Sequence, residues 1–340
     1  MFHEEFLCIY YRILMSSMKT KVVVVIQNWN GEDFIKESLR SLEKQSLHHD
    51  IIVVDNGSSD SSVSIIEKLF PKVRLLKFIN NAGFAGGVNR GIKPALKESY
   101  EYIALFNNDA VADKHWLERL VGAATLHNES GIITGKFMRM DKKHIDSTGD
   151  QYSIWGMPFP SNRNLLDNES FSKGQHVFSA TGGASLYRAS MLEKIGLFDE
   201  KFFAYYEDVD MSFRAQLAGW KVWYEPTAVA YHHVSGTSSK LGDFSRYHAT
   251  KNFFMLYVKN MPTPLFIKYL PLFFLQSVRL FISSLVQGSG LVFIKGKLKS
   301  LSYTKQVLKD RKSIQSTRKV TSRYIDSILY KHRPPKIPTV

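Results

Sequence analysis

Short apolar runs alternate with amphipathic stretches over the first 110 residues. Residues 21–26 (KVVVVI) and 51–54 (IIVV) are continuous and β-branched, which is typical of parallel strands buried on both faces. Between them, residues 32–45 repeat apolar side chains at helical spacing and carry charges on the other face. Further runs at 73–78 and 102–106 each follow a helix-like stretch. The pattern predicts an open, doubly wound parallel sheet.

Polar loops follow three of these predicted strands, at residues 27–31 (QNWNG), 55–60 (DNGSSD) and 107–109 (NND). Turn and helix-capping chemistry explains any one of them, because Asn, Asp, Gly and Ser suit strand-to-helix turns. All three loops nevertheless follow the carboxyl ends of strands, where open parallel sheets bind their ligands. We therefore expect them to converge on one site.

An acidic stretch opens a helix predicted later in the chain. Residues 196–219 (GLFDEKFFAYYEDVDMSFRAQLAG) place Glu207, Asp208 and Asp210 in its first turn. Acids at that position offset the helix dipole, and Asp210 is spaced to pair with Arg214, so stability alone explains Asp210. Asp208 lies beside a loop rich in glycine and aromatic residues, which favours a chemical role for its carboxylate.

Two histidines in succession follow a predicted strand at residues 227–231. Neighbouring side chains of an extended chain point to opposite sides, so at most one of His232 and His233 is expected to enter a given site. With Asp109, that histidine could complete the shell of a divalent cation that also binds phosphate oxygens. An ordinary hydrogen-bonded histidine is the alternative.

The middle of the chain gives weaker signals. Residues 138–174 mix His, Asp, Ser, Pro and Gly with isolated aromatics, which predicts loops that cover a cleft. Residues 178–187 (FSATGGASLY) are small and rich in glycine. They suit a close approach of the backbone to a ligand, and close packing against a neighbouring element explains them equally well.

The composition limits what the chain can be. With 340 residues, 44% of them hydrophobic, the chain can bury the core of one large α/β domain with an extension or of two modest domains. The single cysteine, Cys8, excludes a disulfide within the chain, a cysteine-based zinc site and an iron–sulfur cluster. A reducing, cytoplasmic compartment is expected. Residues 1–17 do not have the pattern of a secretory signal peptide and are interpreted as a dispensable extension or an upstream start.

Positive charge is concentrated at the C-terminal end. The net charge is +14, and residues 295–340 carry thirteen Lys or Arg against two Asp, which indicates an anionic partner, either membrane lipid or nucleic acid. Residues 266–293 are apolar, but Lys268, Pro271 and Arg279 interrupt them. The segment is therefore expected to lie on an anionic membrane surface rather than to cross the bilayer. A soluble helical subdomain packed on the body is the alternative.

Five motifs, in this order, resemble the family 2 glycosyltransferases: DNGSSD (55–60), NAGFAGGVNRGI (81–92), LFNNDA (105–110), GLFDEKFFAYYEDVDMSFR (196–214) and YHHVSGTS (231–238). The chain is most similar to the rhamnosyltransferase-like branch that builds bacterial surface polysaccharides, over roughly residues 21–262. The resemblance implies a GT-A fold, an α/β, Rossmann-like domain whose mostly parallel central sheet is flanked by helices.

The resemblance also implies a reaction. The enzyme would move a sugar, with rhamnose from dTDP-rhamnose favoured, from a nucleoside-diphosphate donor to a lipid-linked saccharide, inverting the anomeric carbon in one displacement. We expect a GT-A domain at residues 18–261 and a basic helical extension at 262–340 that anchors it to the inner face of the cell membrane. The cofactor would be Mg²⁺ or Mn²⁺, and no nucleic-acid partner is expected.

Individual roles follow from the same resemblance. Asp208 is the candidate general base, and Asp109 and His232 are the candidate ligands of the cation. Residues expected to bind the donor nucleotide are Asn28, Asn30, Asp55, Gly57, Asn81, Gly83, Asn89 and Asn108. Those expected to bind the acceptor or the sugar are Gly182, Gly183, Glu207 and Arg214. The family's Asp-x-Asp motif lacks its first acid here, because residues 107–109 are Asn-Asn-Asp.

The chemistry itself requires the same kinds of residue. Inverting transfer needs one carboxylate to take a proton from the acceptor hydroxyl and a cation to offset charge on the departing diphosphate. Hydrolysis by two carboxylates is a competing interpretation. Two others are a non-catalytic scaffold that binds nucleotide sugars in polysaccharide assembly, suggested by the incomplete Asp-x-Asp, and nucleic-acid binding by the basic tail. The chain has no GxGxxG or Walker A motif.

Overall fold

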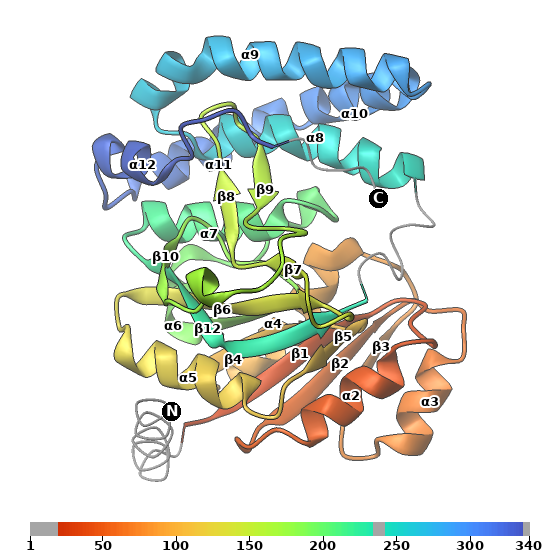
Figure 1. Ribbon diagram of the computed structural model, residues 1–340. Helices are drawn as coiled ribbons and strands as arrows, with labels where there is room; N and C mark the ends of the chain where they lie inside the picture. The colour runs from red at the N-terminus through yellow and green to blue at the C-terminus, as the bar shows by residue number, and fades with distance from the viewer. Residues whose placement is uncertain (1–19, 234–241, 336–340) are drawn as a thin grey trace.

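The β-branched runs near the N-terminus form four parallel strands. In the computed structural model, which describes residues 20–233 and 242–335, they are β1 (Val22–Asn28), β2 (Asp50–Asn56), β3 (Arg74–Phe78) and β4 (Tyr102–Asn107). They lie in the order β3-β2-β1-β4, and each neighbouring pair is parallel (Figure 1). The predicted parallel sheet is confirmed, and its carboxyl ends share one edge.

Later residues extend this sheet beyond β4. β11 (Ala184–Arg188) is antiparallel to both β4 and β6 (Ser130–Arg139). β6 in turn lies parallel to the long strand β12 (Lys221–His232), and β10 (Gln175–Val177) follows at the edge. The complete order is β10-β12-β6-β11-β4-β1-β2-β3. The sheet is therefore mixed. The first four strands of the chain, β1 to β4, are parallel, and β10 and β11 add antiparallel pairs.

Short strands bring other segments to the edge of this sheet. β5 (Ala110–Ala112) pairs with β12, and β7 (Ile145–Ser147) pairs with β6. β8 (Asp150–Tyr152) and β9 (Pro158–Pro160) form a separate hairpin. The register between β5 and β12 sets Ala110 opposite His232, which brings the loop after β4 to the end of β12.

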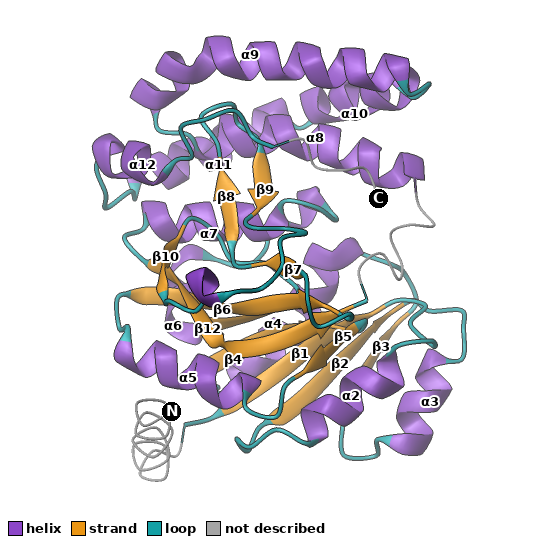
Figure 2. Ribbon diagram, viewed as in Figure 1, coloured by secondary structure: helices purple, strands orange, loops and turns teal. Residues whose placement is uncertain are grey.

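Helices cover both faces of the sheet (Figure 2). Those on one face are α2 (Ile35–Glu43), α3 (Ser62–Leu69) and α5 (Trp116–Leu126). Those on the other are α4 (Gly83–Lys97), α6 (Ala189–Ile195) and α7 (Glu207–Leu217). Two short 3₁₀ helices, η1 (Glu169–Phe171) and η2 (Glu200–Phe202), lie in the connections.

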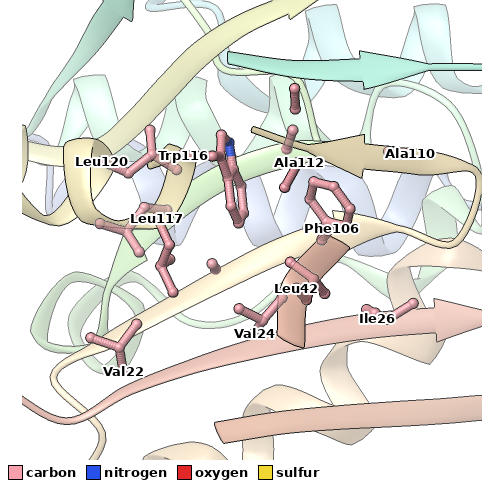
Figure 3. Packing of buried hydrophobic residues seen from close by; sticks show 14 of the residues in the cluster. Val22, Val24, Ile26, Leu42, Phe106, Ala110, Ala112, Trp116, Leu117 and Leu120 are labelled. Carbon is pink, nitrogen blue, oxygen red and sulfur yellow. The ribbon is translucent and has the colours of Figure 1, made fainter. Parts of the chain in front are cut away.

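The strand β1 shows why its sequence is apolar at successive positions. Val24 and Ile26 join the core on one face, which also contains Trp116 of α5 (Figure 3). Val23 and Val25 face the other way and pack with α4. All four side chains are completely buried. Both faces of the strand are covered, as its continuous β-branched run predicts.

A layer of helices lies beyond α7 at the C-terminal end. These helices are α8 (Gly242–Asn260), α9 (Thr263–Val286), α10 (Gly290–Ser302), α11 (Thr304–Ser316) and α12 (Ser322–Ile328). Tyr269 and Phe273 of α9 are buried in a third core together with Phe253 of α8 and Phe213 of α7. The C-terminal helices therefore share a core with the α/β body.

The helix α9 contains the three residues that interrupt the apolar run in the sequence. It continues through Lys268, Pro271 and Arg279 for 24 residues. Pro271 costs the helix one backbone hydrogen bond, and Tyr269 and Phe273 on either side hold this turn against the third core. The interruption of the apolar run therefore does not end the helix. Among the described residues α9 is the helix that is long and apolar enough, by length and composition alone, to cross a membrane.

Candidate active site

A cavity of about 660 Å³ opens where the loops after β1 and β4 leave the sheet. Gln27, Trp29 and residues 107–109 contribute to its lining from these loops. Residues 203–209, at and before the start of α7, form another part, and the β8–β9 hairpin supplies Pro158–Pro160. The cavity therefore lies at the strand ends where the sequence predicts a site.

Nine of the fifteen predicted site residues line this cavity. They are Asn81, Gly83, Asn108, Asp109, Gly182, Gly183, Glu207, Asp208 and His232. The six outside the lining are Asn28, Asn30, Asp55, Gly57, Asn89 and Arg214. The candidate base and the candidate cation ligands thus face one common space.

The loops after β1, β2 and β4 are joined by hydrogen bonds next to the cavity. Asn28 is completely buried, and its Nδ2 donates to Asp55 Oδ1 at 3.2 Å. Its Oδ1 accepts a hydrogen bond of 3.0 Å from Asn108 Nδ2. Asn30 Oδ1 accepts a hydrogen bond of 2.8 Å from the Ser59 N–H. The predicted convergence of the three loops is confirmed.

Three predicted residues outside the lining make contacts within the fold. Asn89 of α4 donates to the Phe198 carbonyl at 2.8 Å and accepts from the Phe198 N–H at 3.1 Å. Arg214 of α7 donates to Asp210 Oδ2 at 2.9 Å and to backbone carbonyls after α6. Gly57 has φ of +83°, and a Cβ there would lie 2.7 Å from a backbone carbonyl oxygen. These residues hold the surrounding elements in position.

The pairing of β5 with β12 sets Asp109 beside His232. The His232 Nε2 atom is 3.2 Å from Asp109 Oδ1, and its Nδ1 atom is 2.9 Å from Asp146 Oδ2. Burial opposes the charged imidazole, but the hydrogen bonds with the two carboxylates raise the pKa of His232 to about 9. His233 is outside the lining, and its Nε2 lies 3.4 Å from Glu37 Oε2. One of the two successive histidines enters the site.

Asp109 and His232 could hold a divalent cation as a pair of ligands once the cation displaces the proton between His232 Nε2 and Asp109 Oδ1. Within residues 20–233 and 242–335, no group of three or more His, Cys, Asp or Glu side chains is arranged to hold a metal ion. A carboxylate oxygen and an imidazole nitrogen nevertheless face each other, and Asp146 fixes the second nitrogen, as is usual for histidine ligands. Such a pair leaves coordination positions open for oxygens of a bound substrate.

Asp208 presents its carboxylate to the cavity at the start of α7. Its Oδ2 accepts a hydrogen bond of 2.9 Å from the Gly182 N–H, and its Oδ1 accepts one of 2.8 Å from the Val209 N–H. A Cβ on Gly182 would lie 3.3 Å from the Asp208 Cβ, so glycine permits this close approach. Burial raises the pKa of Asp208, although the N–H donors oppose the rise. The carboxylate keeps lone pairs that can accept a proton.

Glu207, the residue before Asp208, has a different environment. Its side chain is buried, and Oε2 has no hydrogen-bond partner within the described residues. Burial and the neighbouring charge of Asp208 raise the pKa of Glu207 well above its ordinary value. Burial and the charge of Asp208 therefore favour the protonated form of Glu207.

The loop before α7 has an unusual backbone. Phe203, Tyr205 and Tyr206 have φ values of 66°, 71° and 70°, in the left-handed region that aromatic residues rarely adopt. Asn252 of α8 donates to the Ala204 carbonyl at 2.8 Å and to the Tyr205 carbonyl at 2.6 Å. The helix α8 thus holds a strained loop that lines the cavity.

Three charged residues of this region were missed by the sequence analysis. Asp150 on β8 and Arg163 after β9 line the cavity, and Asp146 on β7 contacts both His232 and Arg163. All three lie within residues 138–174, for which the sequence predicts only loops that cover a cleft. The sequence offers one signal for them, the two acids of Asp-Ser-Thr-Gly-Asp. Outside a helix, this spacing does not place two side chains on the same face.

Comparison with known families identifies the chain. The family model described as "Glycosyl transferase family 2" matches residues 23–196, just over half of the sequence. The chain belongs to glycosyl transferase family 2. The resemblance carried by the five motifs is confirmed, and the protein is a glycosyltransferase.

The relatives of this glycosyltransferase include rhamnosyltransferases. The N-acetylglucosaminyl-diphospho-decaprenol L-rhamnosyltransferase of Mycobacterium tuberculosis (strain ATCC 25618 / H37Rv) is 25% identical over 209 residues, which cover 56% of this chain and 68% of that protein. The rhamnosyltransferase WbbL of Escherichia coli (strain K12) is 26% identical over 229 residues, 63% of this chain and 83% of WbbL.

Solved structures share the fold. TarS 1–349 of S. aureus matches with a TM-score of 0.52 at 17% identity, over 92% of this chain and 93% of TarS 1–349. GalNAc-T7 with UDP, GalNAc and Mn²⁺ matches with a TM-score of 0.53 at 14% identity, over 70% of this chain and 47% of that chain. The predicted GT-A type of fold is confirmed.

Proposed function

We propose that this enzyme moves a sugar, with rhamnose from dTDP-rhamnose favoured, to a lipid-linked saccharide in the synthesis of a cell-surface polysaccharide. Two relatives are rhamnosyltransferases, and the name of one specifies an N-acetylglucosaminyl-diphospho-decaprenol acceptor. TarS has been solved with UDP-GlcNAc, a nucleotide sugar. The observation that carries the proposal is the Asp208 carboxylate, held by Gly182 at the cavity that Asp109 and His232 also line.

The donor would bind where the loops after β1, β2 and β4 meet. Asn28 and Asp55 join these loops by hydrogen bonds, and Asn108 lines the cavity next to Asp109. Asn81 and Gly83 line the cavity at the start of α4, where the positive end of the helix dipole favours a phosphate. The positions outside the lining, Asn30, Gly57, Asn89 and Arg214, support these elements.

Asp208 would act as the base of one displacement. The acceptor oxygen bonds to the anomeric carbon, the bond from that carbon to the diphosphate breaks with its electron pair leaving on the diphosphate, and the acceptor proton passes to Asp208. Burial raises the pKa of this carboxylate and makes it a stronger base than an exposed aspartate. Attack opposite the leaving group inverts the anomeric carbon.

Other residues would assist the same step. Asp109 and His232 would hold a divalent cation, Mg²⁺ or Mn²⁺, which supplies positive charge for the departing diphosphate. Glu207, whose raised pKa favours the protonated form, lines the cavity and could donate a hydrogen bond to a sugar hydroxyl. Gly182 and Gly183 allow the backbone to approach the reacting groups, since a Cβ on Gly183 would lie 2.9 Å from a side-chain amide.

The outer helices support a membrane location. Large apolar side chains exposed on α9 and α10 are Ile267, Leu270, Phe274, Leu275, Ile282, Leu285, Val286, Leu291, Ile294, Leu298 and Leu301. They make up most of the exposed large apolar residues of the described chain, and basic residues at 295–319 follow them closely. Apolar helices beside Lys and Arg suit the anionic surface of a membrane. We therefore propose that residues 262–340 dock the domain at 18–261 on the cytoplasmic face.

The cavity is near this helical pair. Phe244 of α8 lines the cavity, and two residues later Arg246 Nη2 donates to Gln287 Oε1 at the turn between α9 and α10. A lipid-linked acceptor held by a membrane at α9 and α10 would therefore have a short path to Asp208.

Residues 1–17 lie outside the described part of the chain. The proposal that they are dispensable is tested by measuring the activity of a protein that lacks them.

The test is release of nucleoside diphosphate from dTDP-, UDP- and GDP-sugars. Each donor is given with Mg²⁺ or Mn²⁺ and with N-acetylglucosaminyl-diphospho-decaprenol or membrane lipid extract as acceptor. Turnover of one donor by the wild type and by Glu193→Gln, an exposed carboxylate on α6, with loss in Asp208→Asn supports the proposal. Donor binding without turnover under all conditions would favour the non-catalytic scaffold instead.

A further inference from the structure

A fourth carboxylate lines the cavity, beside those of Asp109, Glu207 and Asp208, and has no role in the reaction described above. Asp150 begins β8 and shares the lining with Glu207 and Asp208. It lies outside the five family motifs and in a region whose sequence predicts only loops. Its position therefore comes from the structure alone.

The backbone of Asp150 is fixed to the segment that also holds Asp208. The Asp150 N–H donates to the Ser179 carbonyl at 2.7 Å, and the Ser179 N–H donates to the Asp150 carbonyl at 3.0 Å. Three residues further along, the Gly182 N–H donates to Asp208 at 2.9 Å. Residues 179–182 thus hold two carboxylates at one cavity in a fixed relation.

The side chain of Asp150 lacks the partners of a structural acid. Ser147 is its one hydrogen-bond partner within the described residues, with Oγ 2.8 Å from Asp150 Oδ1. That hydroxyl also lies 2.9 Å from the Gly149 carbonyl oxygen, so two acceptors share its single hydrogen. The guanidinium of Arg163 is engaged by Asp146, at 2.9 Å between Nη2 and Oδ1. Hydrogen-bonding capacity of Asp150 remains for a ligand in the cavity.

The surroundings of Asp150 suit a sugar. Pro158–Pro160 on the paired strand and the aromatic residues at 203–206 give the cavity apolar surface, which pyranose ring faces can cover. Burial and the charge of Asp208 raise the pKa of Asp150 to about 7, so near neutral pH it can both accept and donate a hydrogen bond. A hydroxyl group offers both partners, whereas a diphosphate is repelled by two neighbouring acids.

We propose that Asp150 is a sugar-binding residue whose carboxyl group holds a hydroxyl of the donor sugar or of the acceptor sugar. The inference rests on the proposed function, because it needs a sugar in the cavity. It assigns two carboxylates to two tasks: Asp208 takes the proton, and Asp150 orients a sugar ring beside it. A hydroxyl of either sugar would make the same hydrogen bond to Asp150. The contact would form when the donor binds in one case and when the acceptor binds in the other.

The test compares full-length wild type with Asp150→Asn, which retains the acceptor for Ser147. Calorimetry measures the affinities of dTDP-rhamnose and of dTDP, and of UDP-GlcNAc and UDP. If the donor sugar is held, the variant binds the nucleotide sugar about tenfold more weakly and the free nucleotide equally well. If the acceptor sugar is held, both affinities stay unchanged and KM for N-acetylglucosaminyl-diphospho-decaprenol rises about tenfold with little change in kcat. Glu169→Gln, an exposed carboxylate outside the lining, is the matched control.

Two results would overturn the inference. Unchanged affinities together with an unchanged KM would show that Asp150 contacts no sugar. A loss of kcat alone, with the acidic limb of the pH–rate profile removed, would make Asp150 the base. A thermal unfolding scan establishes that Asp150→Asn folds as the wild type does. If the wild type itself neither binds nor turns over any nucleotide sugar, the proposed function fails, and the inference fails with it.

Discussion

Two aspartates on the first turn of α7 have opposite surroundings. Asp208 faces the cavity, where backbone N–H groups are its partners and burial raises its pKa. Asp210 is completely buried on the side toward α8, where it bonds to Arg214, Lys259 and Asn260. Burial opposes its charge, yet Lys259 and Arg214 hold the pKa of Asp210 below its ordinary value. Both residues are aspartates, so the groups that contact each side chain cause the opposite shifts in pKa.

The difference shows that the helical layer takes part in building the site. α8 supplies Lys259 and Asn260 to one side of α7, and Asn252 holds the strained loop that leads into its other side. One helix thus combines an acid fixed for stability with an acid left able to take a proton.

The largest effect is expected for Asp208→Asn. Removing the base lowers the turnover of donor and acceptor by about 10²–10⁴-fold, while thermal unfolding stays at the wild-type temperature or rises. In the wild type the rate falls as pH drops through the raised pKa of Asp208, because a protonated acid cannot accept the acceptor proton. Steady-state kinetics across pH measures both. Turnover within about tenfold of wild type would contradict the assigned role.

Asp210→Asn is expected to affect stability instead. It leaves the buried charge of Arg214 without its carboxylate and leaves Lys259 with Asp199 alone, which costs about 3–5 kcal/mol of unfolding free energy at pH 7. Because the folded pKa of Asp210 lies below its ordinary value, this contribution is present above that value and lost as pH falls through the folded pKa. Urea unfolding at pH 7 and at pH 3, below the ordinary value of 3.8, measures the difference. An equal loss at both pH values would show that charge is not the cause.

Glu207→Gln is expected to stabilise the protein. The pKa of Glu207 is raised well above its ordinary value in the folded state, so wild-type stability falls as pH rises past that value. A glutamine removes this loss and raises the unfolding free energy by about 0.5–2 kcal/mol at pH 8, with a smaller gain at pH 4. Chemical unfolding at the two pH values is the measurement. A gain that shrinks with rising pH would mean that Glu207 is ionised in the fold.

Substitutions on the outer face of α9 and α10 are expected to change the stability of the protein least. Phe274, Val286 and Leu291 are 69%, 83% and 74% exposed, so changing all three to Ser leaves unfolding unaltered. Binding to vesicles that contain phosphatidylglycerol falls by about tenfold or more, because apolar area no longer enters the lipid. Ile79→Ser, at a side chain 95% exposed on the α/β body, is the control. Equal vesicle binding by all variants would contradict the docking face.

The predictable part of the fold is the part built from continuous local patterns. The valines of β1 predict a strand covered on both faces, and the polar loops after β1, β2 and β4 predict the site they form. Pro271 does not end α9, since contacts of Tyr269 and Phe273 with distant residues outweigh the loss of one backbone hydrogen bond.

The residues of the site also divide into those that local motifs predict and those that they do not. Asp208, Asp109 and His232 are found from motifs that keep their order along the chain. Asp150 reaches the cavity and Asp146 reaches His232 on strands of three residues, which are too short for a periodic signal and depend on tertiary pairing.

The central claim is that Asp208 acts in the chemical step and not in donor binding. The direct measurement is the affinity for the active nucleotide sugar by calorimetry beside turnover with acceptor, for wild type and Asp208→Asn in the same buffer. The account predicts equal affinities and a turnover lowered by about 100-fold or more. Turnover retained in Asp208→Asn, or a donor affinity lost in proportion to the rate, would contradict it.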